Sequence, residues 1–485
     1  MRRARSRRRR DGAASGDPSP STIPGKVISP VASFQAPRGM RDLLPEEAAA
    51  MDALAAVVQA RALRYGYARI VTPVVEERRV FIKTSGESSD IVGKEMYDVQ
   101  LGGEGDLTLR PEATPAIARA FLGAGLHKAP RPQRFFAYEP MFRGQRPQKL
   151  RFRQFWQWDL ECFGSDEAAV DVEIIEFTHG FFSEVGLTGY EIRVNTIGDA
   201  KCRTTVRQAL TAYFDQHRSA LSAASQRRVD TNVLRVLDSK EAQDRPVVEG
   251  APKIIDLLCD DDREHFSAVQ EGLTGLGIPF RVVPTLVRGL DYYTRTVTEF
   301  VLTAPEFEGI AVAGGGRYDG LFATMGAEDM PGTGIAGGMD VLYHALTQEG
   351  TKVAEEPKPD VYVISAQPDD VANRMQLAAG LRGKGFSVAI DYSRRPLEKQ
   401  LESAIKHGAR VAIIAGTPEA RGGYVMVRDL AKKEQRKTRL AAVVTEVGRH
   451  VRPRAIPTLW RPPSDPGDHE PGAAGETPYL VDPRD

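Results

Sequence analysis

The segment 138–161, YEPMFRGQRPQKLRFRQFWQWDLE, constrains the fold more than any other part of the chain. Two runs that can form strands, 135–143 and 152–161, flank a basic loop at 144–151 in which Pro147 disfavours a helix. The segment therefore predicts an antiparallel hairpin.

The second run divides its side chains between two faces, because successive residues of a strand point to opposite sides. One face is mostly apolar and typical of a core: Phe152, Gln154, Trp156, Trp158 and Leu160. The other face is polar: Arg151, Arg153, Phe155, Gln157, Asp159 and Glu161. Taken alone, this polar face predicts either the solvated side of a half-buried sheet or a binding site.

Composition indicates an ordinary globular protein of two or three domains, with 485 residues of which 41% are hydrophobic and 27% are charged. No run approaches the roughly 18 consecutive apolar residues of a spanning helix, and the N-terminus lacks the apolar stretch of a secretory signal. We therefore expect a cytoplasmic protein without membrane contact. The three scattered cysteines, Cys162, Cys202 and Cys259, predict neither a disulfide framework nor a zinc site, so all three are expected to be reduced.

Charge is unevenly distributed although the net charge is +0. Seven arginines lie in the first ten residues, and the rest of the chain has 58 basic residues (65 less 7) against 65 acidic ones. A nucleic-acid site must therefore be a local basic patch.

Composition shifts divide the chain into four parts. Residues 1–36, rich in arginine and then in serine, proline and glycine, and residues 452–485, rich in proline, are expected to be disordered tails. Residues 37–350 form the larger predicted domain, with a helical insertion at about 199–284. After a polar linker, regular alternation of strands and helices predicts a compact α/β domain with a mixed sheet at 360–450.

Arginines gather in four segments beside glycine, proline or tyrosine: 109–120, 142–155, 286–300 and 311–321. Guanidinium groups bind phosphate in a bidentate manner, and an aromatic ring offers a stacking face to a purine. The chain lacks GxxxxGK[ST], and the glycine run 314–316 is not followed by lysine and a helix, which excludes a P-loop enzyme. These segments predict a polyphosphate site of another kind.

Three segments resemble the class II aminoacyl-tRNA synthetases, in the order and spacing of their motifs 1, 2 and 3: GYARIVTPVVE at 66–76, FRGQRPQKLRFRQF at 142–155 and GTGIAGGMDVL at 332–342. VRGLDYYTRT and AGGGRYDGL are similar to the two histidine signatures of the histidyl-tRNA synthetase family. Three further segments resemble the same family: QAPRGMRDLLPEE, TLRPEATPAIARA and LRVLDSKE. The likeness covers nearly all of 35–447.

This resemblance implies an α+β fold: a class II synthetase-like antiparallel sheet flanked by helices, dimeric through motif 1, with a helical insertion and a C-terminal α/β anticodon-binding domain. It also implies a histidine–tRNA ligase. Such an enzyme activates L-histidine with ATP and Mg²⁺, releases pyrophosphate, and transfers histidine to the 3′ end of histidine tRNA. No metal-ligand motif of the protein itself is expected.

The family's motifs imply roles for individual residues. Two arginines would act at the α-phosphate: Arg143 and Arg288. Four residues would bind ATP: Arg143, Gln145, Arg151 and Phe155. Six would bind histidine: Glu112, Thr114, Gln157, Glu161, Tyr293 and Tyr318. Three in the motif 2 loop would meet the acceptor end of the tRNA, unless the loop is merely solvated: Arg146, Gln148 and Lys149.

Two positions depart from the family pattern, and both concern ATP. Val341 replaces the motif 3 arginine, and Gln145 replaces the glutamate of FRxE; Arg317 is a candidate to compensate. The departures keep an alternative open, a non-catalytic histidine-sensing paralogue like the regulatory subunit of ATP phosphoribosyltransferase. That paralogue lacks the anticodon domain and generally loses the RGLDYY and motif 2 arginines, which this chain keeps.

Overall fold

The computed structural model describes residues 34–86, 89, 91–103, 105–146, 149–367, 371–418 and 422–454. The chain divides into two compact units, Met1–Glu355 and Glu356–Asp485. The tails predicted at 1–36 and 452–485 lie outside the described residues, apart from 34–36 and 452–454.

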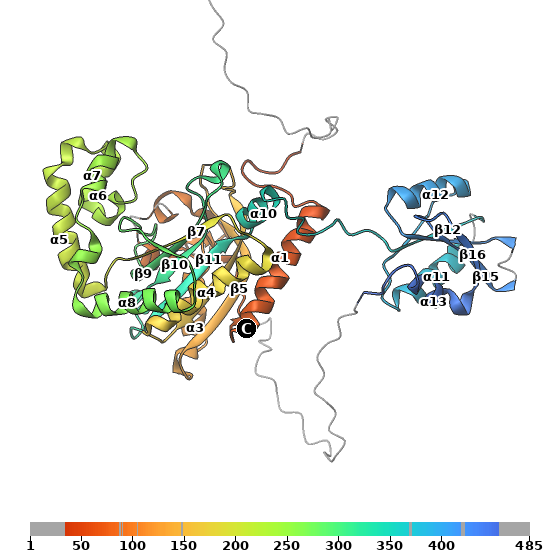
Figure 1. The fold of residues 1–485 in the computed structure, drawn as a ribbon, viewed down its shortest axis with the longest axis horizontal. Helices are drawn as coiled ribbons and strands as arrows, with labels where there is room; N and C mark the ends of the chain where they lie inside the picture. Colours follow the sequence, from red (N-terminus) through yellow and green to blue (C-terminus); the bar gives the residue numbers. More distant parts are fainter. Residues whose placement is uncertain are drawn as a thin grey trace, which may run out of the picture. The chain divides into compact units, whose positions relative to one another are not determined.

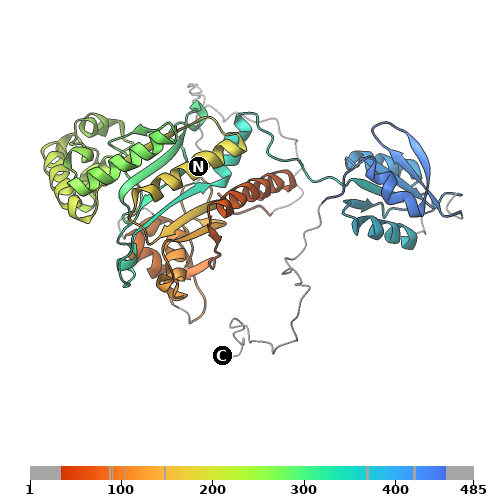
Figure 2. The same ribbon diagram turned by 60° about the horizontal axis from the view of Figure 1, so that its bottom comes forward.

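An eight-stranded sheet forms the centre of the first unit, in the order β1-β5-β6-β11-β10-β9-β7-β8 (Figures 1 and 2). Its strands are β1 (Ala68–Arg69), β5 (Gln133–Phe142), β6 (Gln154–Phe163), β7 (Tyr190–Thr196), β8 (Arg281–Val282), β9 (Thr294–Leu302), β10 (Ala311–Arg317) and β11 (Gly332–Gly338). The six inner strands are antiparallel, whereas β1 and β8 join the edges in parallel. A smaller sheet has the order β2-β4-β3, with β2 (Val75–Glu77), β3 (Tyr97–Val99) and β4 (Leu107–Leu109).

The predicted hairpin is confirmed. β5 and β6 pair without interruption from Gln133 opposite Phe163 to Phe142 opposite Gln154. The predicted division of its faces holds toward the end of β6, because Trp158 and Leu160 lie in one hydrophobic core while Gln157 lines a pocket on the other side. It fails at Phe152, which precedes β6 and lines a pocket instead of the core. Both faces of the sheet therefore carry a hydrophobic core, and the second face also carries the polar residues that line a pocket.

Helices cover the core face of the sheet (Figure 2). They are α1 (Pro45–Arg64), α4 (Ala168–Val185), α8 (Asp260–Gly275) and α10 (Met339–Gln348). The opposite face carries α2 (Arg78–Ser85), α3 (Thr114–Gly123) and α9 (Leu321–Thr324), together with the short helices η1 (Ile91–Glu95) and η2 (Leu126–Lys128). The short helix η7 (Pro305–Phe307) instead places Phe307 in the core on the helix-covered face. α1 begins at Pro45, where a missing backbone N–H costs nothing.

The helical segment between β7 and β8 appears at one end of the sheet (Figure 1). It contains α5 (Ala200–Gln216), α6 (Ala223–Thr231), α7 (Arg245–Glu249), η3 (Arg218–Ala220), η4 (Val233–Val236), η5 (Ala242–Asp244) and η6 (Ile254–Leu257), and returns to the sheet through α8. The Asp199 carboxylate caps α5 by accepting hydrogen bonds from the amides of Lys201 and Cys202.

The prediction of three reduced cysteines is wrong for two of them. Cys202 and Cys259 form a disulfide, and Cys162 is free and buried. The pair is 57 residues apart in sequence, and only the packing of the first turn of α5 against the start of α8 brings the two sulfurs together.

The second unit contains a five-stranded mixed sheet in the order β13-β12-β14-β15-β16. Its strands are β12 (Val361–Ser365), β13 (Val388–Ile390), β14 (Val411–Ala415), β15 (Tyr424–Asp429) and β16 (Gln435–Arg439), and its helices are α11 (Val371–Arg382), α12 (Leu397–Lys406), α13 (Val443–Gly448) and η9 (Leu440–Ala442). β16 was not predicted, because QRKTR has no apolar alternation. In the part of the chain that the structure describes, no helix is both long and apolar enough to cross a bilayer.

Candidate active site

Two adjoining pockets lie on the sheet face opposite α4. The inner pocket has a volume of about 160 Å³ and the outer pocket about 390 Å³. Arg143, Gln157, Arg288 and Tyr293 line both of them. The pockets therefore meet where two guanidinium groups converge.

The inner pocket is lined by carboxylate and hydroxyl groups from separate segments. Tyr292 donates a hydrogen bond to Glu112 at 2.9 Å, and Ser85 donates to the other oxygen of the same carboxylate. Below the pocket, Glu161 accepts hydrogen bonds from Thr114, at 2.5 Å, and from Tyr318. The six residues predicted to bind histidine thus gather at one place.

The later part of the polar face, from Gln157 to Glu161, is buried rather than solvated. Gln157 is 6% exposed, and Asp159 and Glu161 are each 1% exposed. Burial raises the pKa of Glu112, raises that of Glu161 well above its ordinary value, and raises the pKa of Asp159 to about 8. Buried carboxyl groups with raised pKa values gather more often in functional sites than on solvated sheet faces.

The outer pocket contains the residues predicted to bind ATP. The Arg143 guanidinium lies 5.2 Å from the centre of the Phe155 ring, and its Nε donates to the Pro111 carbonyl at 2.8 Å. Gln145 donates to the Phe152 carbonyl at 2.9 Å, and Arg151 lines the same pocket. An aromatic ring beside several cations is a suitable surface for a purine nucleotide.

The Arg288 side chain lies against strand β10, beside Gly314. Its guanidinium pairs with Glu299 and lies 5.7 Å from the centre of the Tyr293 ring. A Cβ atom at Gly314 would lie 2.5 Å from Arg288, so this glycine makes room for the guanidinium. Burial acts to lower the pKa of Arg288, but Glu299 and the neighbouring tyrosines raise it overall, so the side chain stays charged.

Several residues of the predicted cluster lie elsewhere. Arg317 is 0% exposed in its side chain and pairs with Asp171 and Asp319, and it does not line either pocket. The prediction that Arg317 compensates for Val341 is therefore wrong. Arg146 and Lys149 are exposed on the motif 2 loop and line neither pocket, and Gln148 lies outside the described residues.

Comparison with known proteins agrees with this geometry. The histidyl-tRNA synthetase family model matches residues 39–342, and the anticodon binding domain model matches residues 360–450. The chain belongs to the histidyl-tRNA synthetase family. It is 40% identical to the histidine–tRNA ligase of Anaeromyxobacter dehalogenans over 84% of this chain and 98% of the relative. It is also 40% identical to the histidine–tRNA ligase of Desulforudis audaxviator, over 86% of this chain and 99% of the relative.

Solved structures support the same assignment. The apo histidyl-tRNA synthetase of S. aureus matches with a TM-score of 0.73 at 27% identity, covering 85% of this chain and 99% of that one. The histidyl-tRNA synthetase from Nostoc, at 23% identity and a TM-score of 0.61, shares the fold. The predicted fold class, with its flanked antiparallel sheet and C-terminal anticodon-binding domain, is confirmed.

Sequence reasoning missed two residues of this histidyl-tRNA synthetase family site. Tyr292, the first tyrosine of RGLDYY, lines the inner pocket and binds Glu112. Arg235, in LRVLDSKE, reaches the outer pocket from η4 and donates to the Arg288 carbonyl at 3.3 Å. Both segments had been singled out, but only the folded chain shows which of their side chains face the pockets.

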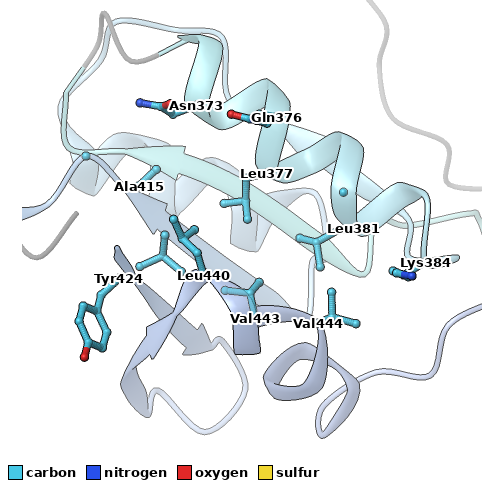
Figure 3. A pocket seen from close by; sticks show the side chains of 13 residues that line it. Asn373, Gln376, Leu377, Leu381, Lys384, Ala415, Tyr424, Leu440, Val443 and Val444 are labelled. Carbon is cyan, nitrogen blue, oxygen red and sulfur yellow. The ribbon is translucent and has the colours of Figure 1, made fainter. Parts of the chain in front are cut away.

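The anticodon-binding domain has a groove of its own, with a volume of about 540 Å³ (Figure 3). Leu377 and Leu381 of α11 face Leu440, Val443 and Val444 across it. Polar groups also line it: Asn373, Gln376, Lys384 and Tyr424. An apolar floor with a few polar groups is typical of a ligand groove.

Proposed function

We propose that the protein is a histidine–tRNA ligase, which joins L-histidine to ATP as histidyl-adenylate and then transfers histidine to the 3′ end of histidine tRNA. One observation carries this proposal: Arg143 and Arg288 line both pockets. An amino acid in the inner pocket would present its carboxylate to the α-phosphate of a nucleotide in the outer pocket. Two fixed cations at that boundary would stabilise the charge that develops as pyrophosphate leaves.

The inner pocket would hold histidine. Glu112 and Thr114 would bind the amino group, while Gln157, Glu161, Tyr293 and Tyr318 would surround the carboxylate and the imidazole. Glu161 is buried with a raised pKa, and a bound imidazole N–H or cation would favour its ionised form. A ligand without that N–H would leave buried polar groups unpaired, which gives strong discrimination.

The outer pocket would hold ATP, with adenine stacked on Phe155 and the phosphates near Arg143 and Arg151. Gln145 would meet adenine through its amide. Mg²⁺ would arrive on the phosphates and neutralise their charge. The lining carboxylates that could contribute to its binding are Glu95 and Asp340. Both oxygens of Asp340 already accept hydrogen bonds, one from Arg41 and the other from the Trp156 amide, which leaves Glu95 as the better placed of the two.

Transfer RNA would contact both units. Arg146, Gln148 and Lys149 of the motif 2 loop would meet the acceptor end, and the 360–450 domain would read the anticodon. The catalytic domain would span 37–350, with the helical insertion at about 199–284. The match of the anticodon binding domain model to residues 360–450 supports this division of roles.

The motif 1 region would form a homodimer interface. Leu63 and Val71 are large apolar side chains that are 63% and 66% exposed, and both lie near edge strand β1. A second copy would cover them. We also propose a cytoplasmic location, because ATP, histidine and tRNA are all present there.

Aminoacylation tests this proposal. Purified protein with ATP and Mg²⁺ should attach labelled histidine to histidine tRNA. The non-catalytic paralogue is the less favoured reading, because this chain keeps the motif arginines and carries an anticodon-binding domain. Histidine binding without any charging would support the paralogue instead.

A further inference from the structure

Two cysteines fasten the ends of the helical insertion together. Cys202 lies in the first turn of α5 and Cys259 precedes α8, with their Cα atoms 5.8 Å apart. The 57-residue separation means that the disulfide closes a loop containing α5, α6 and α7. A cross-link over so long a loop removes much conformational freedom from the opened chain.

One cysteine of the pair is more exposed than the other. Cys202 is 4% exposed, and its Sγ accepts a hydrogen bond from the Cys259 amide at 2.9 Å. Cys259 is only half-buried. A reagent in solution would therefore reach Cys259 first.

Hydrogen bonds connect the disulfide region to residues 293–295, which begin at a residue that lines the inner pocket. Arg203, the residue after Cys202, donates to the carbonyl of Tyr293, which lines that pocket. On the other side, Asp262 accepts hydrogen bonds from the Asp199 amide at 2.6 Å and from Arg295 Nε at 2.8 Å. The Arg295 amide in turn donates to the Gly198 carbonyl at 3.0 Å. Movement of α5 relative to α8 would therefore change the hydrogen bonds that hold residues 293–295 in place.

We propose that Cys202 and Cys259 are a reversible thiol–disulfide exchange site, through which a low-molecular-weight disulfide sets how firmly the insertion holds the amino-acid pocket. The Cys259 thiolate attacks the disulfide R–S–S–R, forms a mixed disulfide, and releases one RS⁻. The Cys202 thiolate then attacks Cys259 Sγ, closes the protein disulfide, and releases the second RS⁻. Two electrons pass from the protein to the reagent, the two thiol protons leave with the released thiols, and two RSH molecules reverse the reaction.

The alternative is that the two cysteines, with two neighbouring aspartates, bind a metal ion. The ligand atoms of Asp199, Cys202, Cys259 and Asp262 all lie within 4.8 Å of one another. Both oxygens of Asp262 are already engaged, and Asp199 Oδ1 caps α5 at 2.8 and 2.9 Å. Because these carboxylates hold the helices and Arg295, the geometry favours chemistry at the two sulfurs.

The test uses the full-length protein equilibrated in glutathione buffers from fully reducing to fully oxidising. Alkylation and mass spectrometry should show loss of two thiols on oxidation, with Cys202 joined to Cys259. The oxidised protein should melt at a temperature higher by several degrees. It should also bind histidine about 2- to 10-fold more tightly. This factor is expected if the disulfide stabilises one hydrogen bond, such as that from Arg203 to the Tyr293 carbonyl.

Variants separate the pair from the third cysteine. Cys202→Ser and Cys259→Ser should each abolish both responses, whereas Cys162→Ala should keep them. Equal melting temperatures and equal histidine affinities in the two redox states would overturn the proposal. So would stoichiometric zinc in the reduced wild-type protein that is lost in Cys202→Ser. The affinity readout rests on the proposed histidine ligand; if neither redox state binds histidine, that function fails, and the alkylation and melting results still decide the exchange site.

Discussion

Arg288 lies at the boundary of the two pockets, in a space that Gly314 leaves open. Arg288→His should lower histidine-dependent pyrophosphate exchange by about 100-fold or more, because removing one preorganised group that stabilises the transition state has that cost. Histidine affinity, measured by calorimetry, should change little. If pyrophosphate exchange and histidine affinity fell equally, and the melting temperature fell as well, Arg288 would instead be a determinant of the fold.

Asp159 makes stability depend on pH. Its pKa is about 8 in the folded protein against an ordinary value of 3.8, so the folded state binds more protons between those limits. Stability from this group is therefore present at low pH and is lost as pH rises toward and through 8. Asp159→Asn should raise the melting temperature at pH 8.5 and have much less effect at pH 5.5. A variant that is no more stable than wild type at pH 8.5 would contradict the protonated state.

Val341 and Arg235 both line the outer pocket. Arg235→Ala should raise the ATP KM about tenfold, since a hydrogen bond to a charged group contributes roughly 1.5–3 kcal/mol. Val341→Arg restores the motif 3 cation, so it should lower the ATP KM by a similar factor and rescue Arg235→Ala in the double variant. Exchange kinetics at varied ATP measure both effects. An ATP KM that is unchanged in Arg235→Ala would remove Arg235 from the site.

At the scale of elements, the proposed role of the motif 2 loop is confined to the transfer of histidine to tRNA. Arg146 and Lys149 are exposed and lie outside both pockets. Changing both to alanine should weaken tRNA charging several-fold, with a shallower salt dependence, because phosphate contacts are lost. Pyrophosphate exchange without tRNA should be unaffected. If exchange falls in parallel with charging, the loop shapes the ATP site instead.

The hairpin shows which features sequence can predict. Alternation along β6 predicted both faces, because a strand's period of two fixes which side chains share a side. It left open whether the polar face was solvated, since Glu161 is covered by Thr114 of α3 and by Tyr318, which are distant in sequence. The same limit explains the errors at Arg317 and the cysteines: their partners, Asp171 and each other, are set by tertiary packing.

At the scale of the whole molecule, the exposed apolar side chains near motif 1 predict association. Val71→Asp should place a charge in the proposed interface and convert a dimer into a monomer, as analytical ultracentrifugation would show. A matched change at Leu276, which is 58% exposed on the helical layer, should leave the dimer intact. A wild-type protein that sediments as a monomer at micromolar concentration would contradict the dimer.

The two-unit organisation also followed from sequence in outline. The polar stretch 350–359 indicated the boundary that the structure places between Glu355 and Glu356. Roles for individual residues, including the joint action of Arg143 and Arg288 at one phosphate, came from the family's motifs, whereas the two pockets that these arginines line became visible only in the folded chain.

Histidine-dependent exchange of labelled pyrophosphate into ATP tests the central claim most directly, because it needs both pockets, both arginines and no tRNA. The wild-type protein should catalyse exchange with histidine and Mg²⁺, and with no other protein amino acid at a comparable rate. Histidine binding with no exchange under these conditions would contradict the claim that the two pockets form one adenylation site.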